Sequence, residues 1–150
     1  MKVVMYTDGS CLKNPGGAGG YCAIVTCESA GTLHTKIVKG GSKSTTNNIM
    51  ELVAVIKGLQ CLTYSCDVEI YSDSQYVVNG FAKGWTDNWK KRNWRTSTGD
   101  VVKNKELWVE LDRLVSMHNS CVFTWVKGHN GHEYNEQCDK IARQEALNRQ

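Results

Sequence analysis

The chain has 150 residues, of which 41% are hydrophobic and 22% are charged, and its formal net charge is +3. This size and balance predict one folded globular domain over 1–150 and exclude a disordered chain. The sequence has no apolar run long enough to cross a bilayer, no signal-peptide pattern, and seven cysteines without a Cys-x-x-Cys pair, so we expect a cytoplasmic protein with reduced thiols and no membrane partner.

The predicted elements begin with three strands. β-Prone runs at 2–7, 20–27 and 33–39 are joined by short links, which predict antiparallel pairing. Helical periodicity then follows a group of N-cap residues and extends over 49–62. The remaining predicted elements are a strand over 67–72, helices over 75–81, 86–91 and 106–118, a strand over 121–126 and a last helix over 135–149.

The order of these elements predicts the fold class. The first, fourth and fifth strands are separated by helices, which favours parallel pairing through right-handed crossovers. We therefore expect an α/β fold whose mixed five-stranded sheet pairs strands one to three antiparallel and strands one, four and five parallel. Helices should cover both faces of this sheet.

Positive charge is concentrated in one segment of the chain. Between Lys83 and Lys105 lie seven of the 18 lysines and arginines, against two aspartates and no glutamate. Such a local excess predicts a basic surface patch that attracts an anionic partner.

Four acidic side chains stand where chemistry is often located. Asp8 and Asp73 follow apolar runs, while Glu51 and Asp139 lie early in helical stretches. Ligands of open α/β sheets gather beyond the carboxyl ends of parallel strands, where these acids can meet. Carboxylates held together need a cation or a raised pKa, and oxygen ligands suit Mg²⁺ or Mn²⁺. Two such ions about 4 Å apart can promote cleavage of a phosphodiester.

Each acid also has an ordinary structural explanation. A lone Asp after a strand is usually a turn former, and a lone Glu in the first turn of a helix usually interacts with the helix dipole. The spacing by itself leaves both explanations open, and the neighbouring motifs decide between them.

The motifs occur in a characteristic order. They are TDGSC at 7–11, NPG at 14–16, TTNNIMEL at 45–52, SDSQYV at 72–77, NWKKR at 88–92, and WVKGH at 125–129, followed by Gly131-His132, Asn135-Glu136 and Cys138-Asp139. Together they resemble type 1 ribonuclease H of the bacterial, free-standing kind, which carries a basic protrusion. The resemblance covers nearly the whole chain and implies a ribonuclease H-like fold forming a single catalytic domain over 1–150.

This resemblance implies an activity and a set of catalytic residues. The activity is endonucleolytic hydrolysis of the RNA strand of RNA–DNA hybrids, leaving 5′-phosphate and 3′-hydroxyl ends. The cofactor is Mg²⁺, which Mn²⁺ can replace, with two ions per active site when substrate is bound. The implied metal-binding catalytic residues are Asp8, Glu51, Asp73 and Asp139, and the implied helper in proton movement or product release is His129, with support from Glu136. The implied partner is the hybrid duplex, bound by a monomer.

The resemblance also implies a substrate surface. Its residues are Cys11, Asn14, Thr46, Asn47, Gln75, Asn88, Trp89, Lys90, Lys91 and Arg92. Amide side chains both donate and accept hydrogen bonds, which suits the reading of 2′-hydroxyls and bases in the minor groove. Thr46 and Asn88 match positions that contact a DNA phosphate, and the basic segment matches the protrusion that holds the DNA strand. Ordinary roles as turn, cap and packed residues are compatible with these, and we expect Trp89 to lie in the core.

Some positions depart from the family pattern. Lys13 and Asn93 stand where bacterial members commonly carry glycine, and Asn130, Glu133 and Tyr134 alter the loop that contains the histidine. None of these departures removes a catalytic residue, but they leave the cleavage rate and the mobility of the loop open.

Other functions need to be weighed. A zinc site built from His129, His132, Cys121 and Cys138 does not match a known ligand spacing. A silent nucleic-acid-binding module would gain from losing acids near phosphates, yet all four acids are present. A DNA-cleaving or strand-transferring relative of the same superfold is disfavoured by the motifs around Asn47 and Gln75 and by the small size of the chain.

Overall fold

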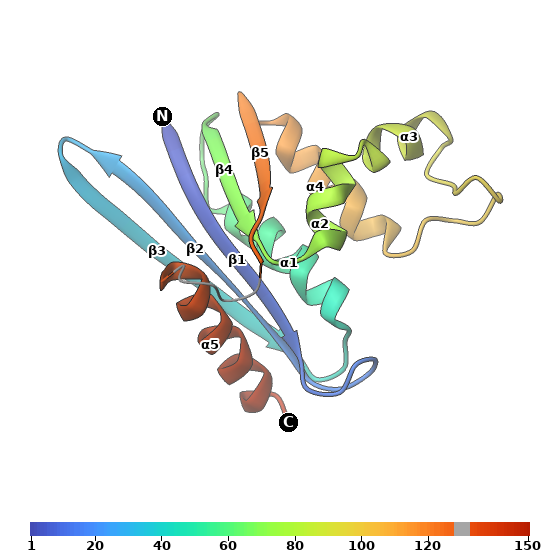
Figure 1. Cartoon of the computed structure of the whole chain (residues 1–150), viewed down its shortest axis with the longest axis horizontal. Helices are drawn as coiled ribbons and strands as arrows, with labels where there is room; N and C mark the ends of the chain where they lie inside the picture. Colours follow the sequence, from blue (N-terminus) through green and yellow to red (C-terminus); the bar gives the residue numbers. More distant parts are fainter. Residues whose placement is uncertain (128–132) are drawn as a thin grey trace.

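The computed structural model describes residues 1–127 and 133–150. Its centre is a five-stranded sheet with the strand order β3-β2-β1-β4-β5 (Figure 1). The strands are β1 (Lys2–Cys11), β2 (Gly19–Ser29), β3 (Thr32–Ser42), β4 (Asp67–Ser72) and β5 (Ser120–Trp125). The pairs β1–β2 and β2–β3 are antiparallel, whereas β1–β4 and β4–β5 are parallel, which confirms the predicted mixed sheet.

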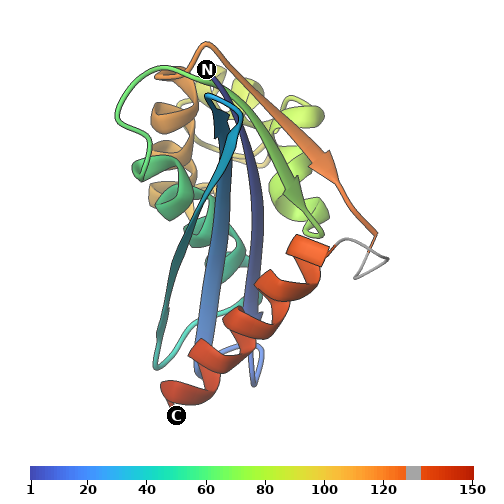
Figure 2. The same cartoon turned by 90° about the vertical axis from the view of Figure 1, so that its left-hand side faces the viewer.

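Helices cover both faces of the sheet, as predicted. They are α1 (Asn47–Gln60), α2 (Gln75–Ala82), α3 (Trp85–Lys91), α4 (Lys105–Ser116) and α5 (Glu133–Asn148). Figure 2 shows α5 lying obliquely across one face, with the other helices on the opposite side. In Figure 1, α3 and the loop that follows it extend away from the sheet. No helix in the described ranges is both long and apolar enough to traverse a bilayer.

The two faces of the sheet follow from the alternation of side chains along its strands. Val3 and Met5 of β1 point into the larger hydrophobic core, which α1 and α4 cover. On the other face, Cys22 and Ile24 of β2 are completely buried with Ala142 and Cys138 of α5 in a second cluster. A Cβ atom added at Gly20 would lie 2.2 Å from the carbonyl oxygen of Ala142, so this glycine permits α5 to approach β2 closely.

Local signals account for where the first helices begin. The hydroxyl of Thr46 accepts a hydrogen bond from the amide of Ile49 (3.2 Å), and the hydroxyl of Ser74 accepts one from Val77 (3.2 Å). Both are N-cap contacts, which satisfy a helix amide that has no partner within the helix. These caps confirm the predicted helix starts, and they place α1 and α2 at the end of the sheet where β1 and β4 finish.

The core differs from expectation in one residue. The completely buried tryptophan is Trp108 of α4, whose ring nitrogen donates to the hydroxyl of Tyr76 (2.8 Å). Trp89 is half-buried and meets Trp108 edge-on, with ring centroids 5.3 Å apart. Trp89 therefore packs against the edge of the core, because the short helix α3 lies outside the sheet layer.

Local backbone geometry explains one departure from the family pattern. Asn93 has φ of +56°, in the left-handed region that favours glycine. Asparagine enters this region more readily than most residues, so Asn93 can take the place of glycine there.

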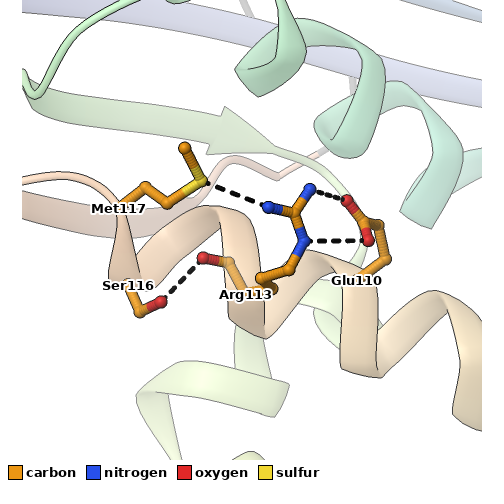
Figure 3. A network of polar contacts seen from close by, with 4 residues as sticks. All are labelled: Glu110, Arg113, Ser116 and Met117. Atoms are coloured by element: carbon orange, nitrogen blue, oxygen red, sulfur yellow. Dashed lines mark hydrogen bonds and ion pairs between the residues drawn. The ribbon is translucent and has the colours of Figure 1, made fainter.

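The outer face of α4 is held by local polar contacts (Figure 3). The guanidinium group of Arg113 pairs with the carboxylate of Glu110 and reaches the sulfur of Met117, and the hydroxyl of Ser116 donates to the carbonyl of Arg113. Contacts three and four residues apart are those expected on a helix surface. The charge of Arg113 is thus compensated within α4.

Candidate functional site

Asp8 and Asp73 emerge side by side from the centre of the sheet. The parallel ladder between β1 and β4 ends with the pair Thr7–Ser72, and each acid is the next residue along the chain. Strand β1 continues to Cys11 through its pairing with β2, so Asp8 lies within β1 rather than beyond its end as predicted. The structure therefore confirms that Asp8 and Asp73 meet at one edge of the sheet, as strand order predicted. Of the two strands, only β4 ends at this edge.

Glu51 reaches the same edge from α1 because a glycine allows the helix to approach. A Cβ atom added at Gly9 would lie 2.4 Å from the backbone nitrogen of Glu51 and 2.5 Å from the carbonyl carbon of Met50. Any larger residue would displace the first turns of α1 from β1. With glycine present, one carboxylate oxygen from each of Asp8, Glu51 and Asp73 lies within 4.8 Å of the other two.

Asp139 approaches from the opposite side, on α5. The preceding residue, Cys138, is buried, and its thiol donates to the carbonyl oxygens of Tyr6 (3.2 Å) and Cys22 (3.4 Å). The carboxyl group of Asp139 hydrogen-bonds to that of Asp8. Arg143, one turn later, has its Nε 3.9 Å from the Asp139 carboxylate. The structure thus brings all four predicted acids to one edge, three in a tight group and Asp139 beside Asp8.

This grouping makes ionisation unfavourable. Burial, followed by the charges of Asp73 and Asp139, raises the pKa of Asp8 to about 9, against a smaller opposing effect of the Gly9 amide, which donates to it at 2.9 Å. Burial, followed by the charges of Asp8 and Asp73, raises the pKa of Glu51 well above its usual range. Desolvation and mutual repulsion therefore leave the protein with carboxyl groups that a cation would stabilise as anions.

The oxygens at this edge fit a hard divalent cation. Glu51 Oε1 and Asp73 Oδ1 are buried, and no amide or hydroxyl group in the part of the chain that the structure describes donates to either of them; the two carboxyl groups interact with each other instead. Buried acceptors without a donor are costly, and carboxylate oxygens are the ligands that Mg²⁺ and Mn²⁺ prefer. The donor set is therefore suited to such an ion.

The predicted minor-groove residues surround this edge. The backbone amide of Asn47 donates to Asn14 Oδ1 (3.2 Å), which joins the loop after β1 to the start of α1. Asn14, Asn47 and Gln75 are exposed, and Gln75 opens α2 two residues after Asp73. Cys11 is half-buried, and its thiol donates to the carbonyl of Lys13 (3.1 Å). These residues lie at the end of β1, in the loop that follows it and at the starts of α1 and α2, the elements that carry or adjoin Asp8, Glu51 and Asp73.

The basic segment divides into paired and unpaired charges. Lys90 Nζ lies 3.3 Å from Asp112 and 3.5 Å from Asp87, so two acids already compensate its charge. Lys91 and Arg92 are exposed and form no ion pair with any other described residue. Asn88 is exposed on the same short helix. The cations available to an anionic partner on α3 and its C-terminal end are thus Lys91 and Arg92 more than Lys90.

Two further sequence predictions have different outcomes. His129 lies outside the described residues, while Glu136 is exposed in the first turn of α5. Cys121 packs against the larger core and Cys138 belongs to the cluster beneath α5. The sheet separates these two cysteines, which argues against a zinc site that uses both.

Sequence reasoning missed two features of this edge. It did not anticipate that Gly9 sets the approach of α1, because a close contact depends on an element distant in the chain. It also missed three stacked tyrosines, Tyr6, Tyr71 and Tyr134, which adjoin the acids. A signal for two of them was present, because Tyr6 and Tyr71 each precede an aspartate by two residues, the repeat of a strand.

Known proteins similar to this chain include many ribonucleases H. The family model described as RNase H matches residues 1–147. The ribonuclease H of Acetivibrio thermocellus is 51% identical over 146 residues, covering 96% of this chain and 94% of that protein. The ribonuclease H of Clostridium botulinum strain Hall is 46% identical over 145 residues, covering 95% of this chain and 94% of that protein.

Solved structures similar to this chain also include ribonucleases H. The crystal structure of LC9-RNase H1, described as a type 1 RNase H with the type 2 active-site motif, has a TM-score of 0.88 and 31% identity, covering 99% of this chain and 74% of that chain. LC11-RNase H1 in complex with an RNA/DNA hybrid has a TM-score of 0.69 at 22% identity and covers 97% of each chain, which supports the fold. The family model, the curated relatives and the fold agree, and this chain therefore belongs to the ribonuclease H family of endoribonucleases, with the fold of its type 1 members.

Proposed function

We propose that residues 1–150 form one catalytic domain that hydrolyses the RNA strand of RNA–DNA hybrids and leaves 5′-phosphate and 3′-hydroxyl ends. The observation that carries this proposal is the group of Asp8, Glu51 and Asp73, whose oxygens lie within 4.8 Å of one another with Asp139 beside them. Membership of the ribonuclease H family supports the substrate class. Two of the similar structures, LC11-RNase H1 and the foamy viral protease-reverse transcriptase, are described in complex with an RNA/DNA hybrid.

In this proposal the four acids hold two divalent cations, Mg²⁺ or Mn²⁺, when substrate is bound. Such ions would supply a more acidic attacking water and would stabilise negative charge on the leaving oxygen. Asp8 and Asp73, at the centre of the edge, contribute oxygens from adjacent strands. Glu51 contributes from α1 and Asp139 from α5. His129 and Glu136 would then assist proton movement or product release.

The residues around the carboxylates would orient the hybrid. Asn14, Asn47 and Gln75 expose amide groups that can contact bases and 2′-hydroxyls, and the backbone near Cys11 would face the RNA strand. Thr46 and Asn88 would contact a phosphate of the DNA strand. Lys91 and Arg92, with a smaller contribution from Lys90, would neutralise phosphates of the same strand beside Trp89. Whether the protein acts as a cytoplasmic monomer stays a prediction.

The test is a cleavage assay on a labelled RNA–DNA hybrid of defined sequence, with duplex DNA and single-stranded RNA as comparison substrates. With Mg²⁺ we expect cleavage of the hybrid RNA alone, and end-group analysis should find 5′-phosphates. Hybrid binding without cleavage in either Mg²⁺ or Mn²⁺ would favour the silent binding module instead. Cleavage of duplex DNA would favour a relative that acts on DNA.

A further inference from the structure

Three tyrosine rings form a continuous stack beside the carboxylates. The ring of Tyr6, on β1, is 4.8 Å from that of Tyr134 on α5 and 5.5 Å from that of Tyr71 on β4. The interplanar angles are 28° and 16°, so both contacts are stacked rather than edge-on. All three side chains are half-buried. We call these three residues the tyrosine ladder.

Each ring of the ladder is followed closely by one of the acids. Tyr6 and Tyr71 are paired across the parallel ladder of β1 and β4, and two residues later the chain reaches Asp8 and Asp73. Residues two apart in a strand share a face, so Tyr6 and Asp8 lie on the face that α5 covers. The stack of Tyr6 on Tyr71 thus joins β1 to β4 two residues before Asp8 and Asp73.

The ladder also seats the helix that carries the remaining acid. Tyr134 and Cys138 are four residues apart on α5 and share one side of the helix. The Tyr134 ring stacks on the Tyr6 ring, and the Cys138 thiol donates to the Tyr6 carbonyl at 3.2 Å. Asp139 follows Cys138 directly and meets Asp8. Tyr6 therefore contacts α5 twice, immediately before the point where α5 and β1 bring two carboxyl groups together.

This seating acts against a repulsive force. Asp8 and Asp139 are both carboxyl groups, and they repel each other when both are ionised, as metal binding requires. The far half of α5 is anchored separately, where Gly20 allows the Ala142 carbonyl to approach β2. The ladder is the corresponding contact at the N-terminal half, nearest the acids. Without it, that half of α5 would lose its ring contact with β1, and Asp139 would be held less firmly beside Asp8.

We propose that Tyr6, Tyr71 and Tyr134 are positioning residues that hold α5 against β1 and β4 and so set the distance of Asp139 from Asp8 in the metal site. This inference rests on the metal site of the proposed function. It requires the rings and not the hydroxyl groups, since the contacts between the tyrosines are ring stacks. Among the described residues, the hydroxyl contact of the ladder with another side chain runs from Tyr71 to Glu69 at 3.3 Å, and Glu69 is not one of the four acids of the site.

The test measures Mn²⁺ binding to the intact protein by calorimetry, without nucleic acid. Removing the central ring in Tyr6→Leu should weaken Mn²⁺ binding about ten-fold, as loss of a residue that orients a metal ligand commonly does. Tyr6→Phe keeps the ring and should bind as the wild type does. In cleavage assays, Tyr6→Leu should need about ten-fold more Mg²⁺ for half-maximal rate, whereas its rate at saturating Mg²⁺ should recover most of the wild-type value.

Phe81→Leu serves as the matched control. Phe81 stacks on Phe123 with centroids 4.5 Å apart, so this variant also loses a stacked pair, but on the other face of the sheet. It should lose thermal stability while keeping the wild-type Mn²⁺ affinity. If Tyr6→Leu does not fold, Tyr134→Leu at the half-buried end of the ladder carries the same expectation.

The outcomes separate the ladder from the metal site itself. Wild-type protein that binds no Mn²⁺ would overturn the proposed metal site, and the ladder's role with it. Wild-type binding that is unchanged in Tyr6→Leu would overturn the ladder alone. If Mn²⁺ binding is weakened equally in Tyr6→Leu and Phe81→Leu, the cause is a general loss of stability. If Tyr6→Phe weakens Mn²⁺ binding as much as Tyr6→Leu does, the hydroxyl group matters. Each of these results contradicts the proposal.

Discussion

The carboxylate edge and the basic segment, the two halves of the proposed site, are built in opposite ways. The acids come from β1, α1, α5 and the connection that follows β4, and Asp8 and Glu51 are only 5% and 9% exposed. The basic residues of α3 and its C-terminal end are consecutive in the chain and exposed to solvent, and α3 itself lies away from the sheet (Figure 1). Charges at the edge are therefore strongly coupled through a poorly screened interior, whereas those on the protrusion act through water and are screened by salt.

This difference predicts that single changes at the edge will have large effects and that single changes on the protrusion will have small, additive ones. In the absence of metal the buried acids also lower the stability of the folded protein, whereas the exposed cations do not. Three experiments, from the largest expected effect to the smallest, test the comparison.

The largest effect is expected for Asp73→Asn. Loss of one central metal ligand should remove several kcal/mol of transition-state stabilisation, which corresponds to a decrease in cleavage rate of roughly 1,000-fold or more. Hybrid binding should persist, because the groove and the basic segment are unchanged. Cleavage kinetics and a binding titration in the same buffer measure the two quantities. Circular dichroism checks that the variant is folded. Substantial residual cleavage by a folded variant would show that Asp73 is not an essential metal ligand.

An intermediate effect is expected on the stability of metal-free protein in Asp8→Asn. The pKa of Asp8 rises from 3.8 to about 9 on folding, so its favourable contribution is complete below about pH 4 and is lost as the pH rises toward 9. Asparagine resembles the protonated acid and lacks this penalty. At pH 7 the variant should be more stable by on the order of 2 kcal/mol, or roughly 4–8 °C in Tm.

Thermal melts at pH 4 and pH 7, with and without Mg²⁺, measure this effect. The advantage of the variant should shrink at pH 4, where the wild-type carboxyl is protonated in the folded protein and already partly protonated in the unfolded chain. Excess Mg²⁺ should also shrink it, because an ion that binds only the folded wild type stabilises that protein. A variant that is less stable than the wild type in metal-free buffer at pH 7 would contradict the sign of this argument.

The smallest effects are expected on the protrusion. Replacing Lys91 and Arg92 together with Ala should lower the slope of log affinity against log salt by about two units, since each exposed cation neutralises about one phosphate. Lys90→Ala should change the slope less than Lys91→Ala, because Lys90 already pairs with Asp112 and Asp87. Binding titrations between low and physiological salt measure the slopes.

Arg113→Ala is the charge-matched control for these variants. It removes one cation from α4, but Glu110 already compensates that charge (Figure 3), so the slope should stay at the wild-type value. Equal slopes for the wild type and the Lys91 and Arg92 double variant would show that the hybrid does not contact this part of the protrusion. A large change in Lys90→Ala would show that the hybrid displaces Asp112 from Lys90.

The sequence by itself determined the secondary structure and the identity of the acids. Hydrophobic periodicity and the cap residues Thr46 and Ser74 act over a few residues, so each helix and strand was predicted, and the helices lie close to their predicted bounds. Strand β1 continues to Cys11, beyond the predicted end at Thr7, because it pairs with β2. Strand order followed from connection lengths, and the ordered motifs around Asp8, Asp73 and Asp139 pointed to one family. These features are local, or depend on chain topology alone, and they need no knowledge of packing.

Only the tertiary structure decided how closely the acids meet and which charges remain available. The approach of α1 depends on the missing side chain of Gly9, and the seating of α5 depends on the stack of Tyr6 with Tyr71 and Tyr134. Lys90 differs from its neighbour Lys91 because Asp112, on another helix, lies beside it. Contacts of this kind join segments far apart in the chain, and their distances are set by the packing of side chains that no local pattern encodes.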